Sequence, residues 1–473
     1  MDNVIQSSVF PKLQPCSEKG LYFRTNARVA ISLQKQEAIF ETGGILRTNT
    51  YFNSISIGKI KKYTNLTNLS LCLNFRGQFK ITWKVRILHQ GDKVVQEDRV
   101  VGEEIGSQEI VLPFWDSLSE GMLFFELQAL EDSVLFGFHY STKDAPVRRV
   151  CLGLVITPFN RPQEVEKTAL RFKKELLQGP YYEGKIQLII VDNSRNLPRS
   201  LADEKGIAVI PNRNLGGSGG FSRGLIHLHH AGDFTHGLFM DDDASSEIES
   251  IRRTFFYLTY THEPKLAIAG AMLRAVQPNM QHENGGRFDG LCYPIKCYYN
   301  LLLTRDLLRN EQEEPIDYGA WWYFAFPLQA VKHLAFPYFV RGDDIGFSLA
   351  NNFHIMTVNG ISSWQADFSH KAGPLQIYLD QRNQIMHFFH GIVKDNRKRK
   401  LLKATLTLFV LNSLAYQYES ARACTLAIYD VLKGPDFWRD NVDMKAKRAE
   451  LLALTQQQKI CSIPEALQKR AEK

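Results

Sequence analysis

The stretch GLFMDDDAS, residues 237–245, places three consecutive aspartates directly after a short apolar run. Three neighbouring carboxylates repel one another unless a cation holds them, which favours a hard divalent metal such as Mg²⁺ or Mn²⁺. Alternate side chains of an extended segment share a face, so Asp241 and Asp243 are the expected ligands and Asp242 points elsewhere. An acidic turn that caps a helix beginning near Glu247 is the alternative interpretation.

Two apolar runs upstream of this stretch also end in polar clusters. Residues 150–157 run into TPFNRP (157–162), and residues 187–191 run into VDNS (191–194). Apolar runs that alternate with helical segments indicate a largely parallel sheet covered by helices. In open α/β sheets ligands bind at the carboxyl ends of the strands, so we expect the three clusters to meet in one crevice.

Between these clusters lies the glycine-rich segment NRNLGGSGGFSRGL, residues 212–225. Its backbone amides could approach an anion closely at the start of a helix, although a flexible turn explains the composition equally well. The segment lacks the GKS or GKT ending of a nucleotide-hydrolase phosphate loop and the GxGxxG dinucleotide fingerprint. The aromatic and Arg side chains of TPFNRP can hold a base and a diphosphate, and the carboxylate of VDNS can accept hydrogen bonds from a base or ribose.

Three downstream motifs carry further candidate groups. YGAWWYFAFP (318–327) offers two tryptophans on which a sugar could stack, or which belong to the core. VRGDDIGFSLA (340–350) predicts one aspartate that caps a helix and one that acts as a base. DFSHKAG (367–373) presents a loop histidine that could complete the coordination of the metal.

The regions on either side of the α/β segment have different patterns, which predicts three domains. Residues 1–148 contain alternating apolar and polar positions, as in Phe79–Ile87, and we expect a β-sandwich or jelly roll. Residues 149–394 form the α/β catalytic domain, and residues 395–473 are expected to be helical. The last region begins with a basic run, 396–400, beside an amphipathic helix. That pattern is typical of peripheral contact with an anionic membrane and of a solvated helix start, and both interpretations stay open.

Composition narrows the class of protein and its compartment. The 473 residues carry 57 basic and 50 acidic side chains, and this net charge of +7 is too dilute to indicate a nucleic-acid partner. Seven cysteines without a CxxC pair suggest neither a zinc site nor a disulfide framework. The N-terminus lacks the pattern of a signal peptide, and the most apolar window, 401–418, contains several polar residues. We therefore expect a cytoplasmic enzyme.

Taken in order, TPFNRP, VDNS, NRNLGGSGGF, FMDDDA, WWYFAFP, RGDDIGF and SHK resemble the motifs of the bacterial galactofuranosyltransferases. These enzymes are inverting transferases of the GT-A fold that take galactofuranose from UDP-galactofuranose. The resemblance covers most of the chain and implies a GT-A domain with a β-domain before it and a helical tail after it. It also implies transfer to a lipid-linked or other growing envelope glycan such as O-antigen. The tail is considerably shorter than in the mycobacterial polymerising member, which leaves processive activity and homo-oligomerisation open.

The resemblance also implies roles for individual residues. Asp241, Asp243 and His370 would hold Mn²⁺ or Mg²⁺, and Asp344 would be the catalytic base. Trp321, Trp322 and Asp343 would line the acceptor site. The implied donor-binding residues are Thr157, Phe159, Arg161, Asp192, Asn214, Gly216, Gly217 and Asp242.

Three alternatives remain at this stage. A transferase that uses a different UDP-sugar would need the same residues. A nucleotidyltransferase would also need paired carboxylates and a metal, but it should carry a basic phosphate-gripping motif, for which Arg223 is the only candidate after the glycines. A non-catalytic glycan-binding protein would use the β-domain and would not need the three aspartates.

Overall fold

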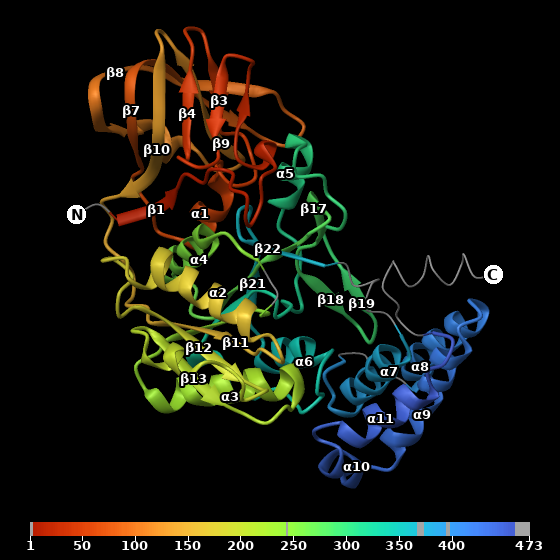
Figure 1. Cartoon of the computed structure of the whole chain (residues 1–473). Helices are drawn as coiled ribbons and strands as arrows, with labels where there is room; N and C mark the ends of the chain where they lie inside the picture. Colours follow the sequence, from red (N-terminus) through yellow and green to blue (C-terminus); the bar gives the residue numbers. More distant parts are fainter. Residues whose placement is uncertain (1–2, 243–244, 367–372, 394–397, 459–473) are drawn as a thin grey trace, which may run out of the picture.

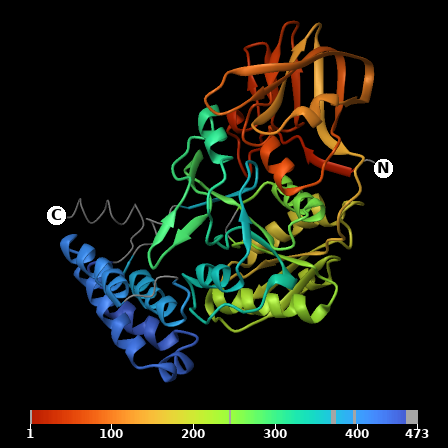
Figure 2. The same cartoon turned by 180° about the vertical axis from the view of Figure 1, so that it is seen from behind.

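The computed structural model describes residues 3–242, 245–366, 373–393 and 398–458. An antiparallel β-domain stands at one end of the molecule, a mixed α/β domain lies in the middle, and a group of helices lies at the other end (Figure 1). The reverse view shows the same order of parts (Figure 2). The mixed α/β class and the helical C-terminal region are therefore confirmed.

The central sheet has seven strands, in the order β13-β12-β11-β14-β20-β15-β21. The strands β11 to β14 are parallel, whereas β20 runs antiparallel to both of its neighbours and β21 is parallel to β15. The strand bounds are β11 (Leu152–Ile156), β12 (Ile186–Asp192), β13 (Ile207–Pro211), β14 (His236–Phe239), β15 (Leu266–Ala269), β20 (Phe324–Pro327) and β21 (His354–Met356).

Helices cover both faces of this sheet, which explains why its strands are apolar throughout rather than alternating. Leu154 of β11 belongs to one core with α2 (Pro162–Phe172) and α4 (Ile248–Tyr260). Its neighbour Val155 points to the opposite face and packs with α3 (Gly216–Ala231) and α6 (Asp343–Asn351).

Smaller elements surround the open edge of the central sheet. A three-stranded sheet contains β16 (Ala271–Arg274), β17 (Gln277–Glu283) and β22 (Ser362–Gln365). The hairpin of β18 (Gly286–Phe288) and β19 (Cys292–Pro294) follows β17, and α5 (Thr304–Asn310) lies beyond it.

The N-terminal strands form one hydrogen-bonded sheet, so the predicted sandwich or jelly roll is not confirmed. All of the strand pairings described for this region are antiparallel, and they join ten strands. Helix α1 (Ile57–Tyr63) lies between β6 and β7. The strands are β1 (Asn3–Ser7), β2 (Arg24–Thr25), β3 (Val29–Ser32), β4 (Glu37–Phe40), β5 (Ile45–Arg47), β6 (Ile55–Ser56), β7 (Ser70–Arg86), β8 (Asp92–Val111), β9 (Met122–Ala129) and β10 (Ser133–Thr142).

The C-terminal helices are α7 (Pro374–Phe389), α8 (Lys398–Leu414), α9 (Tyr418–Leu432), α10 (Pro435–Asp440) and α11 (Lys445–Leu454). Helix α7 packs against α8, α9 and α11, and the predicted boundary between residues 394 and 395 falls between α7 and α8. The other predicted boundary, at 148, falls in the segment between β10 and β11. Within the described residues, no helix combines the length and apolar character needed to cross a bilayer.

The β-domain and the α/β domain share one continuous core, and α4 is central to their contact. The backbone N–H of Ser7 donates to Glu249 Oε1 at 2.6 Å, and Arg253 Nη2 donates to the carbonyl of Phe52. Glu249 and Arg253 are both buried, and Arg253 Nε lies 3.6 Å from Glu249 Oε1. Two side chains of opposite charge are thus buried at the boundary between the domains, where each compensates the other.

We expect Arg253→Met to lower the free energy of unfolding by about 3–5 kcal/mol, because Glu249 would keep a buried negative charge without its partner. The exposed pair of Arg439 and Asp436 offers a matched control, and Arg439→Met should cost about 1 kcal/mol or less. Urea denaturation of the two variants measures both values. Equal losses would show that the buried pair does not stabilise the boundary.

Candidate active site

The loops that follow β11 and β12 are joined to each other at the carboxyl edge of the central sheet. The backbone N–H of Asn193 donates to the carbonyl of Pro158 at 3.2 Å, and the N–H of Asn160 donates to Ser194 Oγ at 2.6 Å. Asp241 follows β14, the strand on the other side of β11. The three polar clusters therefore lie at one edge, as parallel strand order requires.

Asp192 organises its own turn. Its Oδ1 accepts hydrogen bonds from the backbone N–H groups of Ser194 and Arg195, at 3.0 and 2.8 Å, and its Oδ2 accepts one from Leu197 at 3.0 Å. The side chain is buried. Both oxygens thus fix the VDNS loop, and contact with a nucleotide stays a prediction for this residue.

Other predicted donor-binding residues lie in the segments that follow β11 and β14, two neighbouring strands. Arg161 Nη1 lies 3.6 Å from Asp242 Oδ1, and Phe159 beside it is exposed. Thr157 lies so close to α3 that a Cβ at Gly220 would come within 2.8 Å of the Thr157 Cβ. The edge thus carries an accessible aromatic ring, a cation and a carboxylate.

Of the three predicted metal ligands, the structure describes Asp241 alone. Its Oδ2 accepts a hydrogen bond from Gln365 Nε2 at 3.1 Å, and its side chain is partly exposed. Asp243 and His370 lie outside the described residues, and within the described ranges no three His, Cys, Asp or Glu side chains converge as a metal site. A fixed, accessible carboxylate oxygen is the kind of ligand that Mg²⁺ or Mn²⁺ takes, so Asp241 fits the predicted role.

The glycine-rich segment packs against the loop that precedes Asp343. A Cβ at Gly216 would lie 2.0 Å from the carbonyl oxygen of Phe339, and the φ of +70° at this residue also favours glycine. Two residues on, Ser218 donates its backbone N–H to that carbonyl at 3.1 Å and its hydroxyl to Asp343 Oδ2 at 2.9 Å. Asn214 Oδ1 accepts from the N–H of Gly216. The glycines thus allow a close approach that positions Asp343, and binding of the donor by Asn214, Gly216 and Gly217 stays a prediction.

Three other carboxylates lie within electrostatic reach of Asp344, next to this loop. Asp343 and Asp344 begin α6, Glu283 ends β17 and Asp241 follows β14. Burial and then the charge on Asp343 raise the pKa of Asp344 to about 8, and the charges on Glu283 and Asp241 add to the effect. Burial also raises the pKa of Asp343 to about 6 and that of Glu283 to about 7. Burial of these groups favours proton uptake.

The backbone before this pair is strained and is held from both sides. Phe339 and Arg341 have φ values of +75° and +70°, which residues other than glycine rarely adopt. On the side of α7, Asn383 Nδ2 donates to the carbonyls of Val340 and Arg341, at 2.9 and 2.6 Å. Arg382 Nη2 donates to the carbonyl of Tyr338 at 2.5 Å. The C-terminal helices therefore set the position of the two aspartates.

A cavity of about 430 Å³ opens beside the pair of aspartates. Gly342 and Ile345, which flank the pair in sequence, line it, and so does the ion pair of Arg341 and Asp380 at 3.0 Å. The hairpin β18–β19 and helices α7 and α8 supply the other walls: Phe288, Leu291, Cys292, Tyr293, Asn383, Gln384, His387, Thr407 and Leu408. The cavity combines aromatic and hydrogen-bonding side chains, a lining that suits a sugar.

Both tryptophans of the predicted acceptor platform are largely buried. Trp321 is 5% exposed and packs with Phe221, Phe239 and Phe347. Trp322 is 7% exposed and donates its indole N–H to the carbonyl of Gly270 at 2.9 Å. Little ring face is left on which a sugar could stack, so an acceptor role for this pair stays a prediction.

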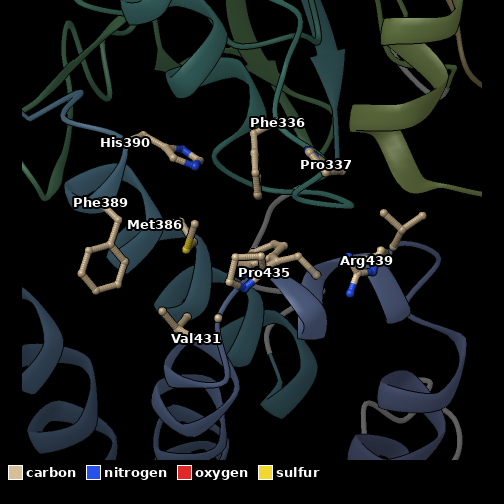
Figure 3. Close-up of a pocket in the computed structure, with 11 residues that line it drawn as sticks. Phe336, Pro337, Met386, Phe389, His390, Val431, Pro435 and Arg439 are labelled. Atoms are coloured by element: carbon tan, nitrogen blue, oxygen red, sulfur yellow. The ribbon is translucent and has the colours of Figure 1, made fainter.

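A second cavity, of about 560 Å³, lies between α7, α9 and α10 (Figure 3). Apolar side chains such as Met386, Val431 and Trp438 form most of its wall, and Arg439 lies at one side. Its lining contains neither Gly342 nor Ile345, the residues of the first cavity that flank the aspartate pair. We therefore assign the chemistry to the first cavity, of about 430 Å³.

Sequence reasoning missed Glu283 and Asn383. Glu283 precedes the turn Asn284-Gly-Gly286, and a carboxylate before a Gly-Gly turn was the one available signal. Asn383 lies in the middle of a helix, where an Asn usually has no role, and the sequence gives no sign that it contacts the loop of the two aspartates.

Two curated proteins are similar to this chain over most of its length. The galactofuranosyltransferase GlfT2 of Mycobacterium tuberculosis is 26% identical over 473 residues, which cover 89% of this chain and 71% of the relative. GlfT2 of Mycolicibacterium smegmatis is 24% identical over 466 residues, which cover 89% and 70%. No family model matches the chain.

Solved structures give weaker similarities. The mannosyltransferase PcManGT from Pyrobaculum calidifontis, in complex with GDP-Man and Mn²⁺, shares 10% identity at a TM-score of 0.35 and covers 66% of this chain and 84% of its own. Residues 1–349 of S. aureus TarS share 13% identity at a TM-score of 0.34 and cover 63% and 92%. Scores this low do not establish a shared fold. The similarity to the two curated transferases supports a glycosyltransferase enzyme.

The raised pKa of Asp344 predicts how Asp344→Asn changes stability with pH. In the unfolded chain Asp344 loses its proton near the ordinary Asp pKa of about 3.9, whereas in the folded protein it keeps the proton up to a pH of about 8. The free energy of unfolding therefore falls as the pH rises between these two values. The isosteric Asn avoids this cost. The melting temperature of Asp344→Asn relative to wild type, both without metal, should therefore be higher at pH 8 than at pH 5. A difference that does not change with pH would contradict the raised pKa.

The contacts of Asn383 predict a loss of turnover when they are removed. We expect Asn383→Ala to lower kcat by about 100-fold with little change in the donor KM, because the two aspartates would shift relative to the substrates. Asn412→Ala is a matched control, since Asn412 is also buried in a helix and donates to the carbonyl of Leu408 at 2.7 Å. Steady-state kinetics of both variants separate the effects, and an equal loss in the control would argue for a purely structural role.

Proposed function

We propose that this glycosyltransferase moves galactofuranose from UDP-galactofuranose to a sugar hydroxyl of a growing cell-envelope glycan such as O-antigen, with inversion at the transferred sugar. One observation carries the proposal: Asp344 stands between Gly342 and Ile345, which line a cavity fit for a sugar, and it lies within electrostatic reach of Asp241 at the strand ends. The 89% coverage of this chain by two galactofuranosyltransferases supports the choice of donor sugar.

The donor would bind along the carboxyl edge of β11, β12 and β14, in the manner of a GT-A domain. The exposed ring of Phe159 can stack on uracil, and Arg161 can pair with the diphosphate in place of Asp242. Asp241, with Asp243 and His370, would hold Mn²⁺ or Mg²⁺, which when bound neutralises charge on the departing UDP.

Asp344 would act as the general base. Its carboxylate takes the proton from the acceptor hydroxyl while that oxygen bonds to the anomeric carbon of galactofuranose and the bond from this carbon to UDP breaks. A single in-line displacement inverts the anomeric centre and needs no nucleophile from the protein. The base must be ionised to accept the proton, so activity should rise with pH toward the raised pKa of Asp344.

The acceptor would lie in the cavity between the β18–β19 hairpin and the C-terminal helices. The exposed ring of Tyr293 can stack on an acceptor sugar, and the ion pair of Arg341 and Asp380 can bind its hydroxyl groups. This assignment gives Tyr293 the stacking role that the sequence suggested for Trp321 and Trp322.

A panel of UDP-sugars tests the proposal directly. With a galactose-containing oligosaccharide acceptor and Mn²⁺, UDP release should be fastest from UDP-galactofuranose and much slower from UDP-galactopyranose, UDP-glucose and UDP-N-acetylglucosamine. Asp344→Asn should cut turnover by about 10²–10⁴-fold and leave UDP affinity unchanged, whereas Asp343→Asn should matter less.

If UDP were released fastest from another UDP-sugar, the proposed donor would be wrong but the protein would still be a glycosyltransferase. A fully active Asp344→Asn together with an inactive Asp343→Asn would reverse the roles of the two aspartates.

A further inference from the structure

We propose that Gln365, at the end of β22, is a positioning residue for the metal, because its side-chain amide fixes the carboxylate of Asp241 for Mn²⁺ or Mg²⁺. The inference rests on the metal-binding role of Asp241 in the proposed function. Gln365 belongs to none of the motifs that predicted the site. It acts on the metal through Asp241 and not as a ligand.

The contact between the two side chains joins a buried amide to a partly exposed carboxylate. Gln365 is 7% exposed, and its Nε2 donates to Asp241 Oδ2 at 3.1 Å. A carboxylate oxygen that accepts one hydrogen bond can still take a further ligand. The amide is neutral, so it orients the carboxylate without competing with the metal as a Lys or Arg side chain would. Carboxylates that bind metals are commonly held by such hydrogen bonds.

The backbone of Gln365 is itself fixed by a sheet. β22 pairs in parallel with β16, where Gln365 stands in register with Arg274. The carbonyl of Gln365 accepts a hydrogen bond from the N–H of Ala275 at 2.8 Å. A donor held by a strand is placed more precisely than one on a loop. The amide therefore reaches Asp241 from a rigid support.

The same strand also holds the other end of the aspartate segment. Trp364 and Ser245 form an antiparallel bridge, with backbone hydrogen bonds of 2.7 and 3.1 Å. The indole N–H of Trp364 donates to the carbonyl of Pro278 at 3.1 Å, and its ring lies 5.7 Å from that of Phe52 in the β-domain. Two neighbouring residues of β22 thus contact the segment at Asp241 and at Ser245.

A second buried glutamine shows that this contact is not what packing alone requires. Gln6 of β1 is 8% exposed, and its Nε2 donates to the backbone carbonyl of Ser54 at 3.1 Å. Most side-chain hydrogen bonds go to the backbone or to water, as that of Gln6 does. Gln365 instead donates to the carboxylate of a predicted metal ligand. The segment that follows it contains a second predicted ligand, His370, which lies outside the described residues.

Calorimetric titration of Mn²⁺ into the full chain, with saturating UDP and no acceptor, tests this role without turnover. We expect Gln365→Met to weaken Mn²⁺ binding by about 10–100-fold, the usual effect of removing a group that holds a metal ligand. Methionine keeps the length of the side chain and removes the donor. Gln6→Met makes the same change at a site of equal burial and should bind Mn²⁺ as wild type does.

Asp241→Asn distinguishes a failure of this proposal from a failure of the proposed metal site. If Asp241→Asn weakens Mn²⁺ binding and Gln365→Met binds like wild type, the positioning role is wrong and the metal-binding role stands. Unchanged affinity in Asp241→Asn, or no Mn²⁺ binding by wild type, would overturn both.

Equal weakening of Mn²⁺ binding by Gln365→Met and Gln6→Met would also overturn the positioning role, because the effect would then follow from a general loss of stability. Circular dichroism checks that each variant is folded. Gln365→Leu, which also lacks the donor, repeats the titration if Gln365→Met does not fold.

Discussion

The burial of carboxylates around Asp344 is the constraint on which the arrangement of this site depends. Glu283 of β17 and Asp343 and Asp344 of α6 have pKa values raised by burial, and the charges on Asp343, Glu283 and Asp241 raise that of Asp344 further. A chain free to relax would move them apart. The fold prevents this from several sides, since the sheet fixes Asp241, β17 fixes Glu283, and the loop before α6 fixes the aspartate pair.

That loop shows how much of the chain contributes to two side chains. Ser218 at the start of α3 bonds to the carbonyl of Phe339 and to the carboxylate of Asp343, and Asn383 of α7 holds the next two carbonyls. Phe339 and Arg341 keep their left-handed backbone because hydrogen bonds from α3 on one side and from α7 on the other hold the loop. The glycine-rich segment thus positions Asp343, and α7 positions the loop that precedes the aspartate pair.

The two outer regions differ in how they join the central domain. The β-domain shares its core with the α/β domain and buries a charged pair at the boundary, so the two form one folded body. The C-terminal helices pack on the other side and present an apolar and basic face of α8 to the outside. One end of the molecule therefore shares the core of the sheet, and the other forms walls of the cavity beside the aspartate pair.

The sequence by itself determined the parallel strands and the polar clusters at their ends, because apolar runs that end in Asp or Asn have few other stable arrangements. The metal-binding roles of Asp243 and His370 remain predictions from sequence, since both lie outside the described residues. Sequence did not determine whether Trp321 and Trp322 face a ligand or the core, because exposed and buried indoles have the same local pattern. It also did not reveal Glu283 or Asn383. Only tertiary structure decided these points, since burial and the meeting of side chains from distant elements depend on packing between segments whose local sequences carry no record of each other.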